Sequence, residues 1–165
     1  MLGLLATTGL SATCCAQDVA QQREAQLKAA YVFNFIKFVD WDARATGRTL
    51  DVCFSGADEV REALALASSD KLVATRSIQV RSLSANASHD DCEVMYVDAS
   101  RSLIGDMPGS ALSVGDAPAF TQKGGIIRLY TESNRLRFVI NVANARKAGL
   151  QISSNLLKLA SQVEQ

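Results

Sequence analysis

One long apolar segment, residues 27–41, restricts the possible folds of this chain more than any other feature. Apolar side chains occupy 11 of its 15 positions, and some recur at helical spacing, which predicts an α-helix over residues 23–39. A helix that is apolar on more than one side must lie between other elements or contact another protein. We therefore predict a partner or dimer surface that is formed by Tyr31, Phe35, Phe38 and Trp41.

Short apolar runs alternate with helical patterns in the middle of the chain. The expected strands are residues 50–54, 77–83, 93–97 and 111–114. Asp58 is the expected N-cap of a helix that ends at Ala67, and residues 117–121 are expected to form a helical turn. Alternation of strands and helices indicates a mostly parallel sheet.

The last third of the chain has a different pattern. Two apolar strands, 126–130 and 135–140, flank a four-residue hairpin loop. Two helices follow, at 142–148 and 153–161, the second capped by Ser153. The sequence as a whole predicts a single three-layer α/β domain over residues 23–162, with a mostly parallel sheet, a C-terminal antiparallel hairpin and helices on both faces.

The first sixteen residues have the composition of an export signal. Residues 2–16 carry no charge and are small or apolar, as in the apolar and cleavage regions of a secretory signal peptide. We expect cleavage after Ala16, although no Lys or Arg follows Met1. Two alternatives are lipidation of Cys14 or Cys15 and a buried or frayed helix.

The cysteines agree with export to the periplasm. Removal of residues 1–16 would leave only Cys53 and Cys92, an even count that suits one disulfide in an oxidising compartment. Such a bridge would join the end of one expected strand to the start of another. The alternative is a pair of free, buried thiols in a cytosolic protein.

Several motifs in this order resemble the YfiR-like family of periplasmic proteins. The resemblance covers most of residues 27–160, and its motifs are KAAYVFNFIKFVDW (28–41), LDVCFSG (50–56), DCEVMYV (91–97), ALSVGDAPAFTQKGGIIRLY (111–130), FVIN (138–141) and AGLQISSNLLKLA (148–160). Each motif alone is weak, but the ordered set is fairly specific. Cys53 and Cys92 each match a bridge position of the family, whereas a second family bridge is absent, because no cysteine lies around Ile127 or Asn134.

The resemblance implies a regulatory binding protein without catalytic activity or a cofactor. The best-understood family role is repression of a membrane-bound diguanylate cyclase through the cyclase's periplasmic domain. A peptidoglycan-linked outer-membrane lipoprotein can draw the repressor away, and family members can form homodimers. We therefore expect an exported regulator whose partner is the periplasmic domain of an inner-membrane signalling protein, either a cyclase or a sensor kinase.

Charge is balanced overall but unevenly distributed. Lys plus Arg equals Asp plus Glu, so the chain has no overall attraction to nucleic acid. Residues 51–120 hold 11 acidic and 5 basic side chains, whereas residues 121–158 hold one acidic and seven basic side chains. If Tyr130 pairs with Arg135 in the hairpin, then Arg128 faces Arg137, and like charges in that position destabilise a sheet.

These hairpin arginines have two possible roles. Arg128, Arg135 and Arg137 share the side of the hairpin opposite its apolar face. They are either solvated and paired with carboxylates, or they bind an anion or an acidic partner. The second role would suit a periplasmic binding protein for a small anionic ligand, which is our alternative function.

Other chemistry has weaker support. His89 is the only histidine, and the consecutive residues Asp90, Asp91 and Cys92 cannot easily converge on one metal ion with it. The pair Gly124-Gly125 lacks the lysine of a phosphate-binding loop and is followed by a strand, which favours a simple turn. Asp116 follows a strand, where it could be a site residue but is expected to cap a helical turn.

Overall fold

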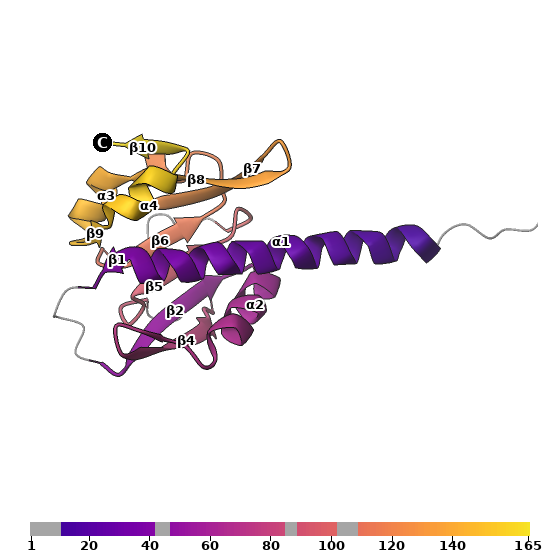
Figure 1. Ribbon diagram of the computed structural model, residues 1–165, viewed down its shortest axis with the longest axis horizontal. Helices are drawn as coiled ribbons and strands as arrows, with labels where there is room; N and C mark the ends of the chain where they lie inside the picture. The colour runs from indigo at the N-terminus through magenta and orange to yellow at the C-terminus, as the bar shows by residue number, and fades with distance from the viewer. Residues whose placement is uncertain (1–10, 42–46, 85–88, 102–108) are drawn as a thin grey trace, which may run out of the picture.

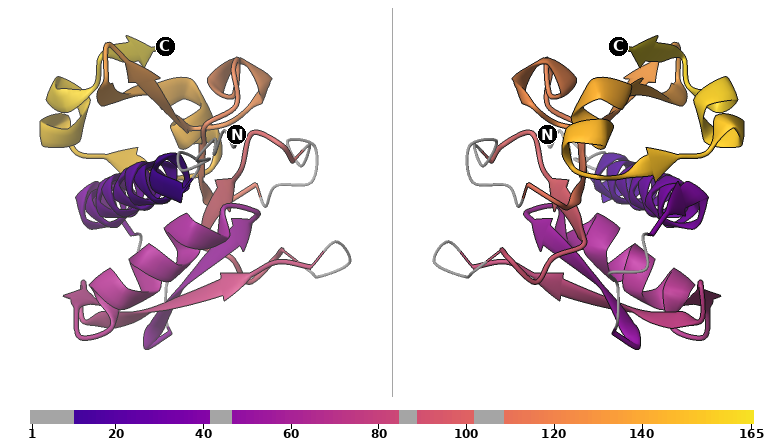
Figure 2. Two further views of the ribbon diagram at one scale, coloured as in Figure 1. Left: turned by 90° about the vertical axis from the view of Figure 1, so that its right-hand side faces the viewer. Right: turned by 90° about the vertical axis from the view of Figure 1, so that its left-hand side faces the viewer.

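The protein is a curled sheet with a long helix lying inside the curl. The computed structural model describes residues 11–41, 47–84, 89–101 and 109–165, with the backbone alone for 11–16. Helix α1 (Ser11–Phe38) runs along the hollow of an eight-stranded sheet, as the two end views in Figure 2 show. Its N-terminal half continues past the body of the molecule (Figure 1).

The large sheet is mostly parallel. From one edge to the other it contains β10 (Gln162–Glu164), β8 (Arg135–Asn141), β7 (Ile127–Glu132), β6 (Leu112–Gly115), β5 (Val94–Val97), β2 (Thr49–Ser55), β4 (Arg76–Ser82) and β3 (Leu72–Val73). Only the β7–β8 hairpin and the β3–β4 pair are antiparallel. Every residue of β5 and β6 is buried, as expected for parallel strands that are covered on both faces. The predicted α/β class, with a parallel sheet and a C-terminal hairpin, is confirmed.

Shorter elements attach the C-terminal third to α1. After β8 come α3 (Val142–Lys147), β9 (Gln151–Ile152) and α4 (Ser154–Leu159). Strand β9 pairs with β1 (Val39–Asp40), which directly follows α1. Ser153 caps α4 as predicted, because its side chain accepts a hydrogen bond from the Leu156 amide. The end of α1 is thus fixed to residues more than 100 positions away.

The main core lies between α1 and the concave face of the sheet. Helix α2 (Asp58–Ser68) packs beside α1 on this face, where it buries Val60 and Leu64 (Figure 1). Phe54 of β2 and Tyr96 of β5 stack with ring centroids 5.1 Å apart. Side chains from most of the chain therefore form one continuous cluster.

A smaller cluster covers the convex face. Met95 and Val97 point away from α1 and contact Phe120, in the turn before η1 (Thr121–Lys123). The Phe120 ring needs two glycines beside it: a Cβ at Gly115 or Gly125 would come within 2.6 Å or 2.2 Å of the ring, respectively. The Gly124-Gly125 pair therefore belongs to a turn, as predicted.

The start of the chain is only partly described. Residues 1–10 of the expected signal peptide lie outside the described residues, and the backbone of 11–16 belongs to α1. The helix thus begins before Arg23, where the sequence pattern placed its start. None of the described helices has the length and apolarity that a membrane span requires. Signal cleavage stays a prediction.

Two expected helix starts differ from the structure. Ala57, not Asp58, is the N-cap of α2, and Asp58 is the first helical residue. Gly56 and Ala57 both have positive φ, so the chain turns in the left-handed region before the helix begins. Within the helical turn expected at 117–121, the Phe120 amide bonds the Ala117 carbonyl, but Ala119 has a positive φ, so the helix itself begins only at η1.

The hairpin register was predicted wrongly by two residues on one strand. Tyr130 pairs with Arg137, and Glu132 pairs with Arg135. Ser133 and Asn134 both have positive φ and form a two-residue turn, which matches the twist of the strands better than a four-residue loop. A shift of two residues leaves each side chain on its predicted face but changes its partner.

Candidate interaction surfaces

The predicted disulfide is present. Cys53 of β2 and Cys92, just before β5, form a bridge with Cα atoms 5.8 Å apart. Strands β2 and β5 are neighbours, with Cys53 opposite Met95. Both cysteines are buried. The bridge therefore joins two central strands and suits an oxidising compartment.

The expected partner surface on the first helix is divided by the fold. Phe35 is only 1% exposed and packs against Phe138, with ring centroids 5.0 Å apart. It belongs to the core, so its inclusion in a partner surface was wrong. Tyr31, Phe38 and Trp41 are half-buried. Those three remain a predicted surface, with Trp41 oriented by a 2.8 Å hydrogen bond from Nε1 to the Ile36 carbonyl.

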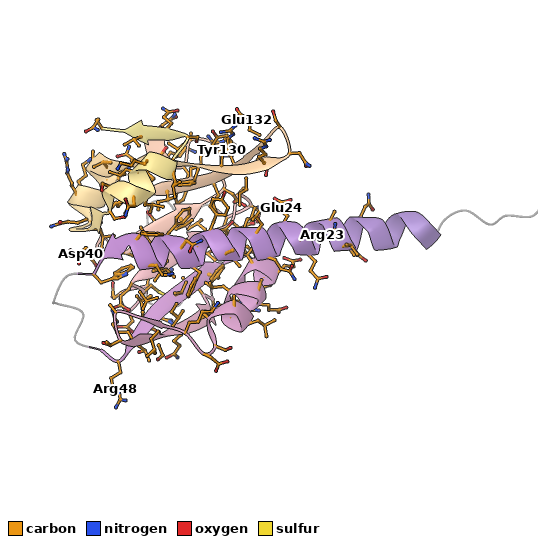
Figure 3. All side chains as sticks on the ribbon, viewed as in Figure 1. Arg23, Glu24, Asp40, Arg48, Tyr130 and Glu132 are labelled. Atoms are coloured by element: carbon orange, nitrogen blue, oxygen red, sulfur yellow. A yellow bond between two sulfur atoms is a disulfide. The ribbon has the colours of Figure 1, made fainter. Side chains whose placement is uncertain are left out.

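The hairpin arginines share one face but do not oppose one another. Arg128 lies opposite Val139, and its guanidinium stacks 5.0 Å from the centroid of the Tyr130 ring. Arg137 forms an ion pair with Glu132, with Nε 2.9 Å from Oε2. Figure 3 shows Tyr130 and Glu132 on the hairpin. The expected Arg128–Arg137 repulsion is absent because the corrected register brings Glu132 among the arginines.

Some hydrogen-bonding capacity on this face is unused. The Nε atom of Arg128 is buried and donates no hydrogen bond within the described chain, whereas the Nε atom of Arg137 lies in the ion pair with Glu132. Arg135 is exposed. The face therefore combines the Arg137–Glu132 ion pair with one unused donor on Arg128, and its role as an anion or partner site stays a prediction.

A polar cluster at the C-terminal edge of the parallel strands joins three elements. The Asp116 carboxylate accepts hydrogen bonds from Lys28 Nζ at 2.9 Å, from the Tyr96 hydroxyl at 3.2 Å and from the Ala99 amide at 2.8 Å. Lys28 also pairs with Glu24, one turn earlier on α1. Asp116 therefore does not act as the expected helix cap. It connects α1 to the sheet instead.

The cluster shifts the pKa values of two members upward. Burial by itself lowers the pKa of Lys28, but its hydrogen bonds and charge attraction to Asp116 and Glu24 raise that pKa above the ordinary 10.5. Burial raises the pKa of Tyr96 far above 10.0, and the Asp116 charge adds to the effect. Lys28 is therefore a cation and Tyr96 neutral at physiological pH. The cluster therefore has a structural role, because neither Lys28 nor Tyr96 has a pKa near neutrality that would suit acid–base catalysis.

A second buried ion pair was missed by the sequence argument. Arg76 of β4 is 7% exposed and bonds both the Thr49 carbonyl and the Glu93 carboxylate. Glu93 in turn accepts a hydrogen bond from the Asp51 amide at 2.9 Å. The sequence offers one signal for this pair, an arginine beside a strand with alternating apolar residues. It does not identify the partner, because Glu93 lies 17 residues further along the chain.

No metal cluster forms in the part of the chain that the structure describes. The His89 carbonyl accepts a hydrogen bond from the Cys92 amide, which forms an ordinary turn before β5. Cys92 is in the disulfide.

Comparison with known proteins identifies a family that matches most of the chain. A family model described as YfiR/HmsC-like matches residues 25–161. A search of curated proteins found no match.

Two solved structures share the architecture. One is a conserved domain protein from Vibrio cholerae O1 biovar El Tor, with 13% identity, a TM-score of 0.58 and 85% of this chain covered. Another is an ABC domain in complex with L-Trp from Streptococcus pneumoniae, with 14% identity, a TM-score of 0.53 and 84% of this chain covered. This chain spans 60% of the length of each of them. At such identities the likeness shows the fold alone.

Proposed function

The chain belongs to the YfiR/HmsC-like family, and from that premise we propose that it is an exported regulator that binds the periplasmic domain of an inner-membrane signalling protein. The best-understood role in this family is repression of a membrane-bound diguanylate cyclase. The family match over residues 25–161 is the observation that carries the proposal. The buried Cys53–Cys92 bridge supports a periplasmic location, since disulfides persist in oxidising compartments.

The mechanism we propose is stoichiometric. When the regulator is bound, it favours one conformation of the membrane protein, and when an outer-membrane lipoprotein removes it, that bias ends. No catalytic step is needed, in agreement with a family that is regulatory and non-catalytic. Tyr31, Phe38 and Trp41 offer partly exposed aromatic area, the kind of side chain that is enriched at protein interfaces.

A cellular experiment tests this proposal. Deletion of the gene from its host should raise cyclic di-GMP if the partner is a cyclase, and expression of the exported chain should restore the original level. The control is the same chain without residues 1–16, which should stay in the cytoplasm and should not restore it. An unchanged level after deletion would reject the cyclase as the partner, and restoration by the cytoplasmic chain would reject action in the periplasm.

A second candidate function is the binding of a small anion on the hairpin. The observation that favours it is the buried, unused Nε donor of Arg128, which lies on the same face of the hairpin as Arg137. Guanidinium groups hold phosphate and carboxylate well. Calorimetric titration with inorganic phosphate and with a dicarboxylate tests this function, and saturable heat that disappears in Arg128→Gln would support it. The Arg23→Gln variant, which alters an exposed arginine on α1 outside the hairpin, is the matched control and should bind as the unaltered chain does.

A further inference from the structure

A groove between α1 and α2 has the shape and charge of a docking site. It has a volume of about 660 Å³ and lies where the N-terminal part of α1 passes α2 (Figure 1). The α1 wall is formed by Asp18, Gln21, Gln22, Ala25 and Gln26, and the α2 wall by Glu59, Glu62, Ala63, Leu66 and Ala67. On each helix these residues recur three or four positions apart, so each wall is one helix face.

Apolar side chains contribute to both walls of the groove. Ala25, Ala63 and Ala67 are small, so a third helix can approach the two backbones closely. Leu66 is 81% exposed, the most exposed of the large apolar side chains in the described chain. Covering such a side chain with a partner contributes the most binding free energy, at about 25 cal/mol per Å² of apolar area removed from water.

The charge on the groove has a single sign. Asp18, Glu59 and Glu62 line it, and its described residues include no Lys or Arg. Arg61 lies beside it but is shared between Asp58 and Glu62, at 3.2 Å from each. Asp18 and Glu59 form no ion pair with any described residue. A partner with Lys or Arg at its edges would complement this surface.

The dimensions suit a short helix. Residues 18–26 of α1 cover about 12 Å at 1.5 Å per residue, which is roughly two helical turns. An amphipathic helix in a groove places apolar anchors on one side and charged residues along the edges. The corresponding α1 segment of a second copy is a poor occupant, because its residues 17–27 include Asp18 and Glu24 but only one base, Arg23.

We propose that this groove binds a basic amphipathic helix of the membrane partner. The assignment of the helix to that partner rests on the proposed function. The attraction requires both parts of the groove: Leu66 and the alanines contact the apolar side of the helix, and Asp18 and Glu59 contact its Lys or Arg residues.

The first test uses peptides, so that it does not depend on the partner's identity. The probes are a helical peptide of roughly 15 residues with Leu on one face and Lys on the other, and its counterpart with Glu in place of Lys. Chemical shifts of the isotope-labelled chain should change with the Lys peptide at Ala25, Ala63 and Leu66, and should not change with the Glu peptide. Shift changes located elsewhere would overturn the groove as the site.

Variants separate the two attractions. Glu59→Lys and Leu66→Ser should each weaken binding of the Lys peptide by about fivefold or more, in line with roughly 1 kcal/mol per contact. Asp70→Lys reverses an exposed charge just after α2, and Leu159→Ser removes an apolar side chain that is 68% exposed on α4. These matched controls should bind as the unaltered chain does. If the controls lose as much affinity for the Lys peptide, the binding does not depend on the groove, and the proposal is overturned.

A second test uses the periplasmic domain of the inner-membrane signalling protein whose output changes when this gene is deleted from its host. If the domain binds the unaltered chain and Glu59→Lys equally well, the groove proposal fails and the proposed function survives. If the domain binds neither, the proposed function fails and the peptide titration still decides the groove. A changed oligomeric state in Glu59→Lys would instead make the groove a contact between copies, which contradicts the proposal.

Discussion

At the scale of single residues, a few buried polar groups connect elements that the sequence pattern treats separately. Lys28 is the clearest case, because it interrupts an apolar helix and pairs with Asp116, which lies 88 residues later in the chain. The sequence shows that such a lysine needs an acidic partner, but it does not show which carboxylate the fold brings near it. The Cys53–Cys92 pair was predictable because two cysteines remain after the expected cleavage.

Removal of the Asp116 charge should destabilise the protein. Asp116→Asn leaves Lys28 largely buried without its main partner, and loss of one member of a buried pair typically costs several kcal/mol. Lys28 and Asp116 side chains are 17% and 14% exposed, so we expect a loss of about 2 kcal/mol after allowance for solvent screening. Urea unfolding measures it, with the exposed Asp91→Asn as the control that should change little.

Stability should fall at alkaline pH because of the same cluster. Lys28 has a raised pKa in the folded state, so its contribution is complete below 10.5 and is lost as pH rises through the folded value. Tyr96 also has a raised pKa, so above pH 10.0 the unfolded chain ionises it more readily and is favoured. Urea midpoints from pH 8 to 11 should decline above pH 10, and less steeply in Tyr96→Phe. Equal slopes would contradict this account of Tyr96.

Loss of the disulfide should also lower stability. The bridge closes a loop with a sequence separation of 39, for which chain entropy gives roughly 4 kcal/mol. Cys53→Ser should therefore unfold at a lower urea concentration than the oxidised protein, and the reduced protein should behave similarly. Mass spectrometry of the exported chain provides the direct check, and free thiols on both cysteines would contradict the bridge.

At the scale of elements, the strands and helices with clear periodicity were predictable, and the short ones were not. Strand β2, helix α2 and strand β4 agree with the pattern to within about two residues. Strands β1, β3, β9 and β10 contain only two or three residues, so their pairing depends on the rest of the fold rather than on a local pattern. The hairpin register was missed because Glu132 and Arg135 extend the strands to a two-residue turn.

The two sides of α1 should respond differently to substitution. Phe35→Ala removes a buried ring that packs on Phe138 and should cost about 3–5 kcal/mol. Leu27→Ala, at a side chain that is 46% exposed, should cost less than about 1 kcal/mol. The urea midpoints of the two variants test whether Phe35 is buried and Leu27 is not. Similar losses of stability in both variants would mean that α1 is buried on a different side.

At the scale of the whole molecule, one helix organises the fold and leaves surfaces for other proteins. The curled sheet surrounds the C-terminal half of α1, whereas the N-terminal half projects and forms the groove with α2 (Figure 1). The α2 wall of that groove belongs to the acidic middle of the chain, and the basic last third forms the hairpin. The sequence could predict this charge division, but the groove depends on how α1 and α2 pack.

Direct titration of this chain into the isolated periplasmic domain of the inner-membrane signalling protein whose output changes on deletion of the gene tests the central claim. Isothermal calorimetry should show saturable binding with a fixed stoichiometry, together with a negative heat-capacity change from burial of apolar surface. The same titration into an unrelated periplasmic domain should produce no binding heat. Absence of saturable binding to that periplasmic domain, with both proteins folded and the Cys53–Cys92 bridge intact, would contradict the account.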